Sequence, residues 1–74
     1  MSDFFSAGVR LGLVYSYLFS RRSLANPQQS EQLNKIENYL DGLRDNVLDG
    51  TLTNISLILE SLISYKAQVD AVFE

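Results

Sequence analysis

The sequence predicts an all-α protein of three helices, at about residues 3–19, 27–48 and 53–73. Two observations carry this prediction. In each segment apolar residues recur at alternating spacings of three and four, which is the pattern of helices that pack side by side. Between the segments, Asn26-Pro27 and Asp49-Gly50 provide helix start and stop signals. A chain of 74 residues is expected to form one domain, 1–74, whose small core is completed by oligomerisation.

The first helix is expected to be apolar on nearly all sides, with Ser2 or Asp3 as its N-cap. One face consists of Phe4, Ala7, Leu11, Val14 and Leu18. The opposite side carries Phe5, Val9, Leu13, Tyr15, Tyr17 and Phe19. Such a helix either lies centrally in a core or is shared between chains, so it is expected to pack on its own hairpin or on another chain. Gly8 and Gly12 either permit close approach of a helix or are simply tolerated.

Residues 26–74 are expected to form a long antiparallel helical hairpin. Asn26 is a preferred N-cap, Pro27 suits the first helical position, and Gln29 completes a capping-box spacing. The apolar seam of the second helix consists of Leu33, Ile36, Leu40, Leu43 and Val47.

The third helix is expected to follow a turn in which Gly50 adopts the left-handed conformation and Thr51 or Thr53 supplies the N-cap. Its seam consists of Ile55, Ile58, Leu62, Tyr65, Val69 and Val72. A second apolar stripe of Leu52, Leu59, Ile63 and Phe73 predicts a further neighbour, either the first helix or another copy of the chain.

Charge is distributed unevenly along the chain, whose net charge is −3. Residues 1–25, the apolar helix and its connection, carry Asp3 against three arginines, whereas the hairpin carries a net charge of −5. Three dispersed arginines are too few for a nucleic-acid footprint, so no nucleic-acid partner is expected. An acidic stripe at i,i+4 spacing is expected on the solvated face of the second helix, with a docking face for a basic partner or a metal site as alternatives. The stripe consists of Glu37, Asp41, Asp45 and Asp49.

Residues 4–19 are strongly apolar, but they are fewer than the roughly 20 needed to span a bilayer and they include Arg10. The leading region carries Asp3 rather than a positive charge, which is unlike a signal peptide. A cytoplasmic protein without a signal peptide, transmembrane span or stable membrane insertion is therefore expected. Reversible attachment of the first helix to a membrane surface is an alternative, disfavoured by its few Lys and Arg residues.

The sequence contains no Cys and no His, which removes disulfides, thiolate and imidazole ligands and the commonest proton carrier. It contains neither a Ser-x-x-Lys pattern nor a glycine-rich phosphate loop. We therefore expect no catalytic residues, no metal site and no cofactor, and a protein that is not an enzyme.

The leading functional hypothesis is a protein–protein interaction module, acting as a homo-oligomer or as a small adaptor, inhibitor or subunit of a larger protein through helix-on-helix burial. The expected partner-binding residues are Phe4, Phe5, Leu11, Tyr15, Leu18, Phe19, Leu59 and Ile63. The alternative is an oligomer that sequesters an anionic, nucleotide-like small molecule at a subunit junction by stacking and bidentate contacts. Its candidate anion-binding residues are Arg10, Tyr17, Arg21 and Arg22.

Overall fold

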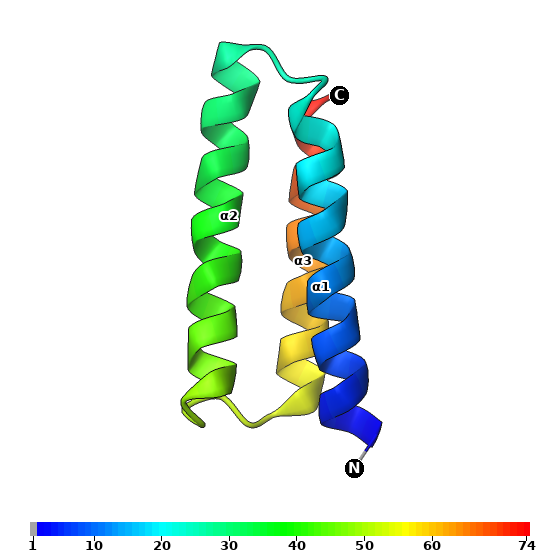
Figure 1. Ribbon diagram of the computed structural model, residues 1–74, viewed down its shortest axis with the longest axis vertical. Helices are drawn as coiled ribbons and strands as arrows, with labels where there is room; N and C mark the ends of the chain where they lie inside the picture. Colours follow the sequence, from blue (N-terminus) through cyan, green and yellow to red (C-terminus); the bar gives the residue numbers. More distant parts are fainter. Residues whose placement is uncertain (1) are drawn as a thin grey trace.

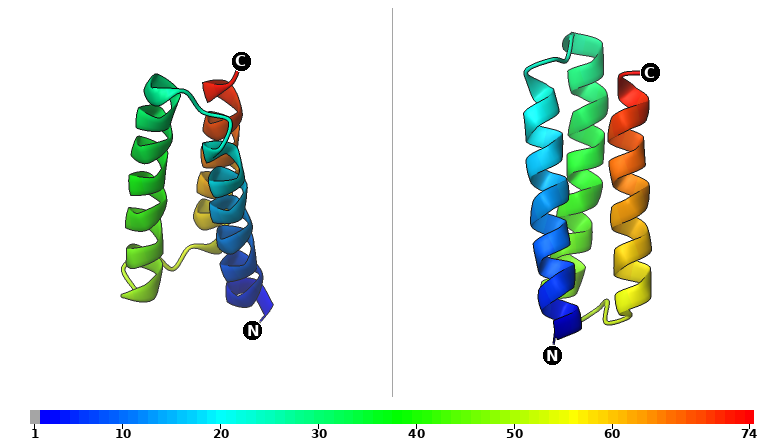
Figure 2. Two further views of the ribbon diagram at one scale, coloured as in Figure 1. Left: turned by 45° about the horizontal axis from the view of Figure 1, so that its top comes forward. Right: turned by 90° about the vertical axis from the view of Figure 1, so that its right-hand side faces the viewer.

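The structure is a computed structural model that describes residues 2–74, with side chains from Phe4 onward. It contains three helices: α1 (Ser2–Arg22), α2 (Pro27–Leu48) and α3 (Ile55–Val72). Helix α2 runs antiparallel to both α1 and α3, which lie side by side and run parallel to each other (Figure 1; Figure 2). The bundle measures 40 × 18 × 15 Å. The predicted all-α fold of three helices is confirmed, and α1 packs on its own hairpin.

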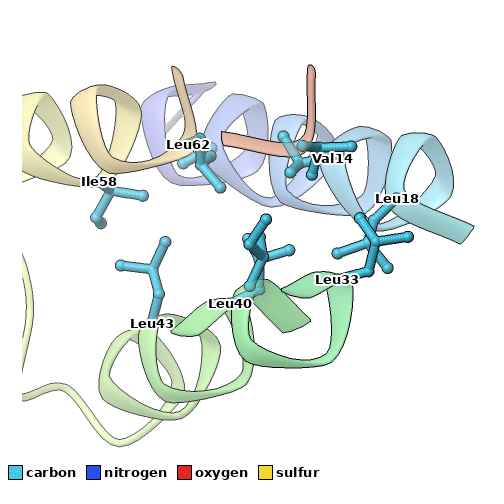
Figure 3. Packing of buried hydrophobic residues seen from close by; sticks show 10 residues of the cluster. Val14, Leu18, Leu33, Leu40, Leu43, Ile58 and Leu62 are labelled. Atoms are coloured by element: carbon cyan, nitrogen blue, oxygen red, sulfur yellow. The ribbon is translucent and has the colours of Figure 1, made fainter. Parts of the chain in front are cut away.

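The core lies along the long axis, between the three helices. Figure 3 shows leucines of α2 pointing across this space toward side chains of α1 and α3. Each buried side chain occupies a position that the spacing pattern assigned to a seam, because that spacing returns a side chain to the same face of a helix. The buried core consists of Ala7, Val14, Leu18, Leu33, Ile36, Leu40, Leu43, Ile58, Leu62 and Val69.

The start and end of α2 follow the predicted signals. The Asn26 side chain accepts a hydrogen bond from the Gln29 backbone N–H at 2.8 Å, and the Gln29 side chain accepts one from the Asn26 N–H at 3.0 Å. This reciprocal pair satisfies backbone donors at the helix N-terminus. Beyond the C-terminus, Gly50 has a φ of 79°, the left-handed conformation that glycine adopts at least cost.

The prediction that Thr51 or Thr53 caps α3 is wrong, because the cap is Asn54. Its side chain accepts a hydrogen bond from the Leu57 N–H at 3.2 Å. Residues 49–53 are needed to cross from α2 to α3, and the Leu52 N–H bonds back to the Asn46 carbonyl at 2.9 Å. Leu52 also packs against the core from this connection. Helix α3 therefore begins only after the turn has closed, at Ile55.

Helix α1 continues to Arg22, beyond the predicted end at residue 19. Arginine is a good helix former, and two arginines in the last turn interact favourably with the negative end of the helix dipole. The N-cap predicted at Ser2 or Asp3 depends on side chains outside the described part of the chain. Within residues 2–74, no helix combines the length and the apolar character needed to cross a bilayer.

Gly8 and Gly12 do not form a close helix contact within the described chain. A Cβ atom added at either position would meet nothing within 4 Å. Both residues are exposed on α1. The packing of α1 on its hairpin therefore does not require them to be glycine.

Candidate interaction surface

The structure divides the predicted partner-binding residues between the core and several surfaces. Leu18 is completely buried, so its inclusion in a partner-binding surface is corrected: it belongs to the core of its own chain. Leu11, Tyr15 and Leu59 are partly buried and pack against that core. Only the three predicted phenylalanines of α1 and Ile63 of α3 are exposed, and they do not share one face. The three phenylalanines are Phe4, Phe5 and Phe19.

Phe4 and Phe19 lie on the side of α1 that faces α2. Phe4 lines a cavity of about 210 Å³ together with Leu43 and Leu48 of α2. Phe19 lines a separate depression with Glu37 and Asp41 of α2. They do not line the groove between α1 and α3 to which Leu59 and Ile63 belong.

An apolar ridge runs along the outer side of α1. Phe5, Val9 and Leu13 follow one another at i,i+4 and are 74%, 48% and 63% exposed. These three residues are called the outer ridge. Val9 and Leu13 were not among the predicted partner-binding residues, although the spacing pattern places both on the side opposite the face that α1 buries.

Beside the outer ridge, a groove of about 520 Å³ lies between α1 and α3. Leu13 and Ile63 are its exposed apolar residues, whereas Val14 and Leu62 belong to the buried core. Leu13 and Arg10 also line the neighbouring depression that contains Phe5 and Val9, so ridge and groove form one continuous surface. The groove is lined by Arg10, Leu13, Val14, Tyr17, Leu59, Leu62, Ile63 and Lys66.

One end of the groove is closed by a polar cluster around Tyr17. The Tyr17 hydroxyl donates a hydrogen bond to the Asp70 carboxylate of α3 and accepts one from Arg21 at 3.2 Å. Lys66 lies 3.4 Å from the same carboxylate, and the cations of Lys66 and Arg21 each lie 4.6 Å from the Tyr17 ring centre. The hydrogen bond from Tyr17 is the main reason why the pKa of Asp70 is lowered.

A second set of polar contacts joins α1 to α2. The Tyr15 hydroxyl donates to Asp41 at 2.5 Å, and Arg22 forms an ion pair with Glu37. Burial, followed by the hydrogen bond to Asp41, raises the pKa of Tyr15 above its ordinary value. Arg22 also donates to the Asn34 side chain at 2.8 Å.

The acidic stripe is therefore only partly solvated, contrary to prediction. Glu37 and Asp41 are half-buried against α1, whereas Asp45 and Asp49 are exposed. At 3.6 residues per turn, each i,i+4 step advances a side chain by about 40° around the helix. The stripe consequently winds from the side that faces α1 at Glu37 to the solvated side at Asp49.

The candidate anion-binding residues do not converge within one chain. Arg22 points to α2 and pairs with Glu37, while Arg21 and Tyr17 gather around Asp70. Of the four, only Arg10 and Tyr17 line the α1–α3 groove. Among the described residues, no group of three or more Asp or Glu side chains is placed to hold a metal ion.

Comparison with known proteins finds no matching family model, no matching curated protein and no matching solved structure.

Proposed function

We propose that this chain is a non-enzymatic protein–protein interaction module that buries the outer ridge and Ile63 against a helix of another chain. The observation that carries the proposal is the continuous exposed apolar surface of Phe5, Val9, Leu13 and Ile63. Contiguous exposed apolar surface is uncommon on small monomers and is typical of interaction sites.

The rest of the fold supports this choice of surface. The outward side of α2 is mostly polar, with Glu31, Lys35, Asn38 and Asp45 exposed. Its exposed Tyr39 and Leu48 are nine residues apart and so lie on opposite sides of the helix. The core already uses the seams of all three helices, so the outer ridge is a second apolar face of α1 that the hairpin leaves uncovered. Burial of such a face stabilises an assembly by about 25 cal/mol per Å² before the cost of association is subtracted.

The test is the molar mass in solution, measured by light scattering across a dilution series, with helicity followed by circular dichroism. If the chain is a homo-oligomer, Phe5→Asp and Leu13→Asp are expected to reduce the mass to that of a monomer without loss of helicity, because both side chains are exposed. Leu24→Asp is the matched control, since Leu24 is an exposed leucine of the connection. Leu11→Asp is less informative, because Leu11 packs against the core.

The outcomes separate the two forms of the proposal. An oligomer whose mass is unchanged in both aspartate variants would show that the outer ridge is not its interface. A wild-type chain that is monomeric at every concentration would exclude the homo-oligomer and leave a small subunit or adaptor of a different protein. That form is tested by the peptide experiment described in the next section.

Sequestration of an anionic small molecule is a second candidate, favoured by one observation. Arg10, Tyr17 and Lys66 line the same groove, so a guanidinium, an aromatic ring and an ammonium group paired with Asp70 lie there together. A thermal-shift screen with nucleotides tests it, because a ligand at 100 times its dissociation constant adds about 2.7 kcal/mol to the free energy of unfolding. No shift with any nucleotide would contradict this candidate.

A further inference from the structure

We propose that the groove between α1 and α3 binds an amphipathic helix of a different protein, whose apolar stripe is flanked by acidic side chains. The partner helix would lie beside α1 and α3 and complete a four-helix bundle. This inference rests on the proposed function, since it names the partner for the same surface.

The shape of the groove suits a helix. The lining residues span Arg10 to Tyr17 on α1 and Leu59 to Lys66 on α3, which is about 10 Å, or two turns, along each helix. The outer ridge extends the apolar surface by more than one further turn, to Phe5. Val14 and Leu62 reach the floor of the groove from the core, so a helix seated there would contact the core itself. Helices that dock in grooves of this kind use apolar anchors at i, i+3, i+4 and i+7.

The charge of the groove selects an acidic partner. Arg10 lines it from α1 and Lys66 lines it from α3, and none of the lining side chains is a carboxylate. Two carboxylates belong to this part of α3: Asp70 accepts hydrogen bonds from Tyr17 and Lys66, and Glu60 is exposed between Leu59 and Ile63 without lining the groove. Among side chains from Phe4 onward, Arg10 has no ion-pair partner. Because Lys66 is paired with Asp70, the cation that the groove offers to a partner is Arg10, on a chain whose net charge is −3.

The same charges disfavour a second copy of the chain as the occupant. The helix with an exposed apolar ridge is α1, and between Phe4 and Arg22 it carries three arginines and no acidic residue. Two copies that met through this groove would bring Arg10 and Lys66 of one chain close to those of the other. Like charges placed together in an interface oppose association, whereas complementary charges favour it.

The experiment uses the full chain and two synthetic helical peptides of about 18 residues, or five turns, with identical leucine stripes. One peptide has Glu at the positions that flank the stripe, and the other has Lys. Binding is followed by fluorescence anisotropy of the labelled peptide, below the concentration at which the peptide associates with itself. We expect the Glu peptide to bind about tenfold more tightly, because an ion pair with Arg10, worth about threefold, replaces a repulsion of similar size.

Two variants test whether the preference for the Glu peptide arises in the groove. Arg10→Gln is expected to weaken binding of the Glu peptide about threefold, whereas Lys35→Gln removes an equal charge from the exposed face of α2 and is expected to leave it unchanged. The net negative charge of the chain works in the opposite direction and would favour the Lys peptide. A preference for the Glu peptide therefore reports the groove rather than the overall charge, and salt at about 1 M is expected to reduce it.

Three outcomes would overturn the inference, and each has a different consequence for the proposed function. Equal binding of the two peptides, or tighter binding of the Lys peptide, would overturn the acidic partner while leaving the interaction module in place. If neither peptide binds and the chain is a dimer that Leu13→Asp dissociates, the occupant is a second copy. If neither binds and the chain is a monomer, both this inference and the proposed function fail.

Discussion

Two tyrosines of α1 show how single side chains hold this helix against its hairpin. Tyr15 donates a hydrogen bond to Asp41 of α2, and Tyr17 donates one to Asp70 of α3. The two bonds lie on opposite sides of the buried stripe that contains Leu18, so together they oppose rotation of α1 about its axis. They thereby help to hold the face that contains Ala7, Val14 and Leu18 against the hairpin.

The hydrogen bond from Tyr17 to Asp70 predicts that removal of the tyrosine hydroxyl changes the pKa of Asp70. Tyr17→Phe removes the principal cause of the lowered pKa of Asp70, so the pKa of this carboxyl is expected to rise toward its ordinary value. NMR titration of the side-chain carboxyl carbon measures it. Tyr39→Phe is the matched control, because Tyr39 is exposed and stacks on Tyr65 at 6.0 Å, away from Asp70.

The same variant changes the pH dependence of stability. A carboxyl whose pKa is lowered by folding stabilises the native state above its unfolded pKa, about 3.9, and that contribution is lost as the pH falls through the folded-state pKa. Urea denaturation below about pH 4 is therefore expected to show a smaller loss of stability in Tyr17→Phe than in the wild type. An unchanged pKa of Asp70 in the variant would contradict the assigned hydrogen bond.

Two leucines of α2 that differ in burial test how much core packing contributes to the free energy of unfolding. Leu40 is 0% exposed and Leu48 is 77% exposed. Leu40→Ala is expected to lower the free energy of unfolding by about 2–5 kcal/mol, because it removes buried contacts and leaves a cavity. Leu48→Ala is expected to change it by about 0.5 kcal/mol or less. Chemical denaturation measures both, and equal losses would mean that the core is not arranged around Leu40.

Among the helices, the start of α2 was predicted correctly, because the sequence there contains only one set of residues with the types and the spacing of a helix cap. Asn26, Pro27 and Gln29 form such a set, and the capping box is present. The start of α3 was different, because Thr51, Thr53 and Asn54 are all cap-forming residues. The backbone bond from Leu52 to Asn46 decides among them, since it uses the residues before Asn54 to close the turn.

The assignment of the α3 cap is testable with neighbouring residues. Asn54→Ala is expected to lower the free energy of unfolding by about 1 kcal/mol, since it leaves a backbone N–H of the first turn without its side-chain acceptor. Thr53→Ala is the matched control and is expected to have little effect, because Thr53 is exposed and lies outside α3. Thermal denaturation followed by circular dichroism compares the two. A larger loss in Thr53→Ala would restore threonine as the cap.

In the whole molecule, α1 is part of the core rather than an appendage of the hairpin. It contributes Ala7, Val14 and Leu18 to the buried cluster and makes polar contacts with both α2 and α3. Without it, the seams of α2 and α3 would each lose a neighbour. A chain of this size has little stability to spare.

The fragment 26–74 is therefore expected not to fold cooperatively by itself. Removal of α1 exposes one side of the core, and two antiparallel helices alone bury too little apolar surface to offset the loss of chain entropy. Circular dichroism during thermal denaturation of the dilute fragment is expected to show reduced helicity and a broad transition. A sharp transition like that of the full chain would show that the hairpin is independent of α1.

The helices, their approximate limits and the identity of the core side chains follow from local patterns, because periodicity and capping act within a few residues along the chain. Leu33, Leu40 and Val69 are buried for that reason. The packing of α1 on its own hairpin and the placing of Glu37 and Asp41 against it depend on contacts between distant segments. The cap at Asn54 depends on the geometry of the turn that the Leu52–Asn46 bond closes. The spacing pattern separates Leu18 from Leu13, but only the tertiary structure shows that α1 buries the face of Leu18 on its own hairpin and not on another chain, because that choice depends on contacts between segments far apart in the sequence.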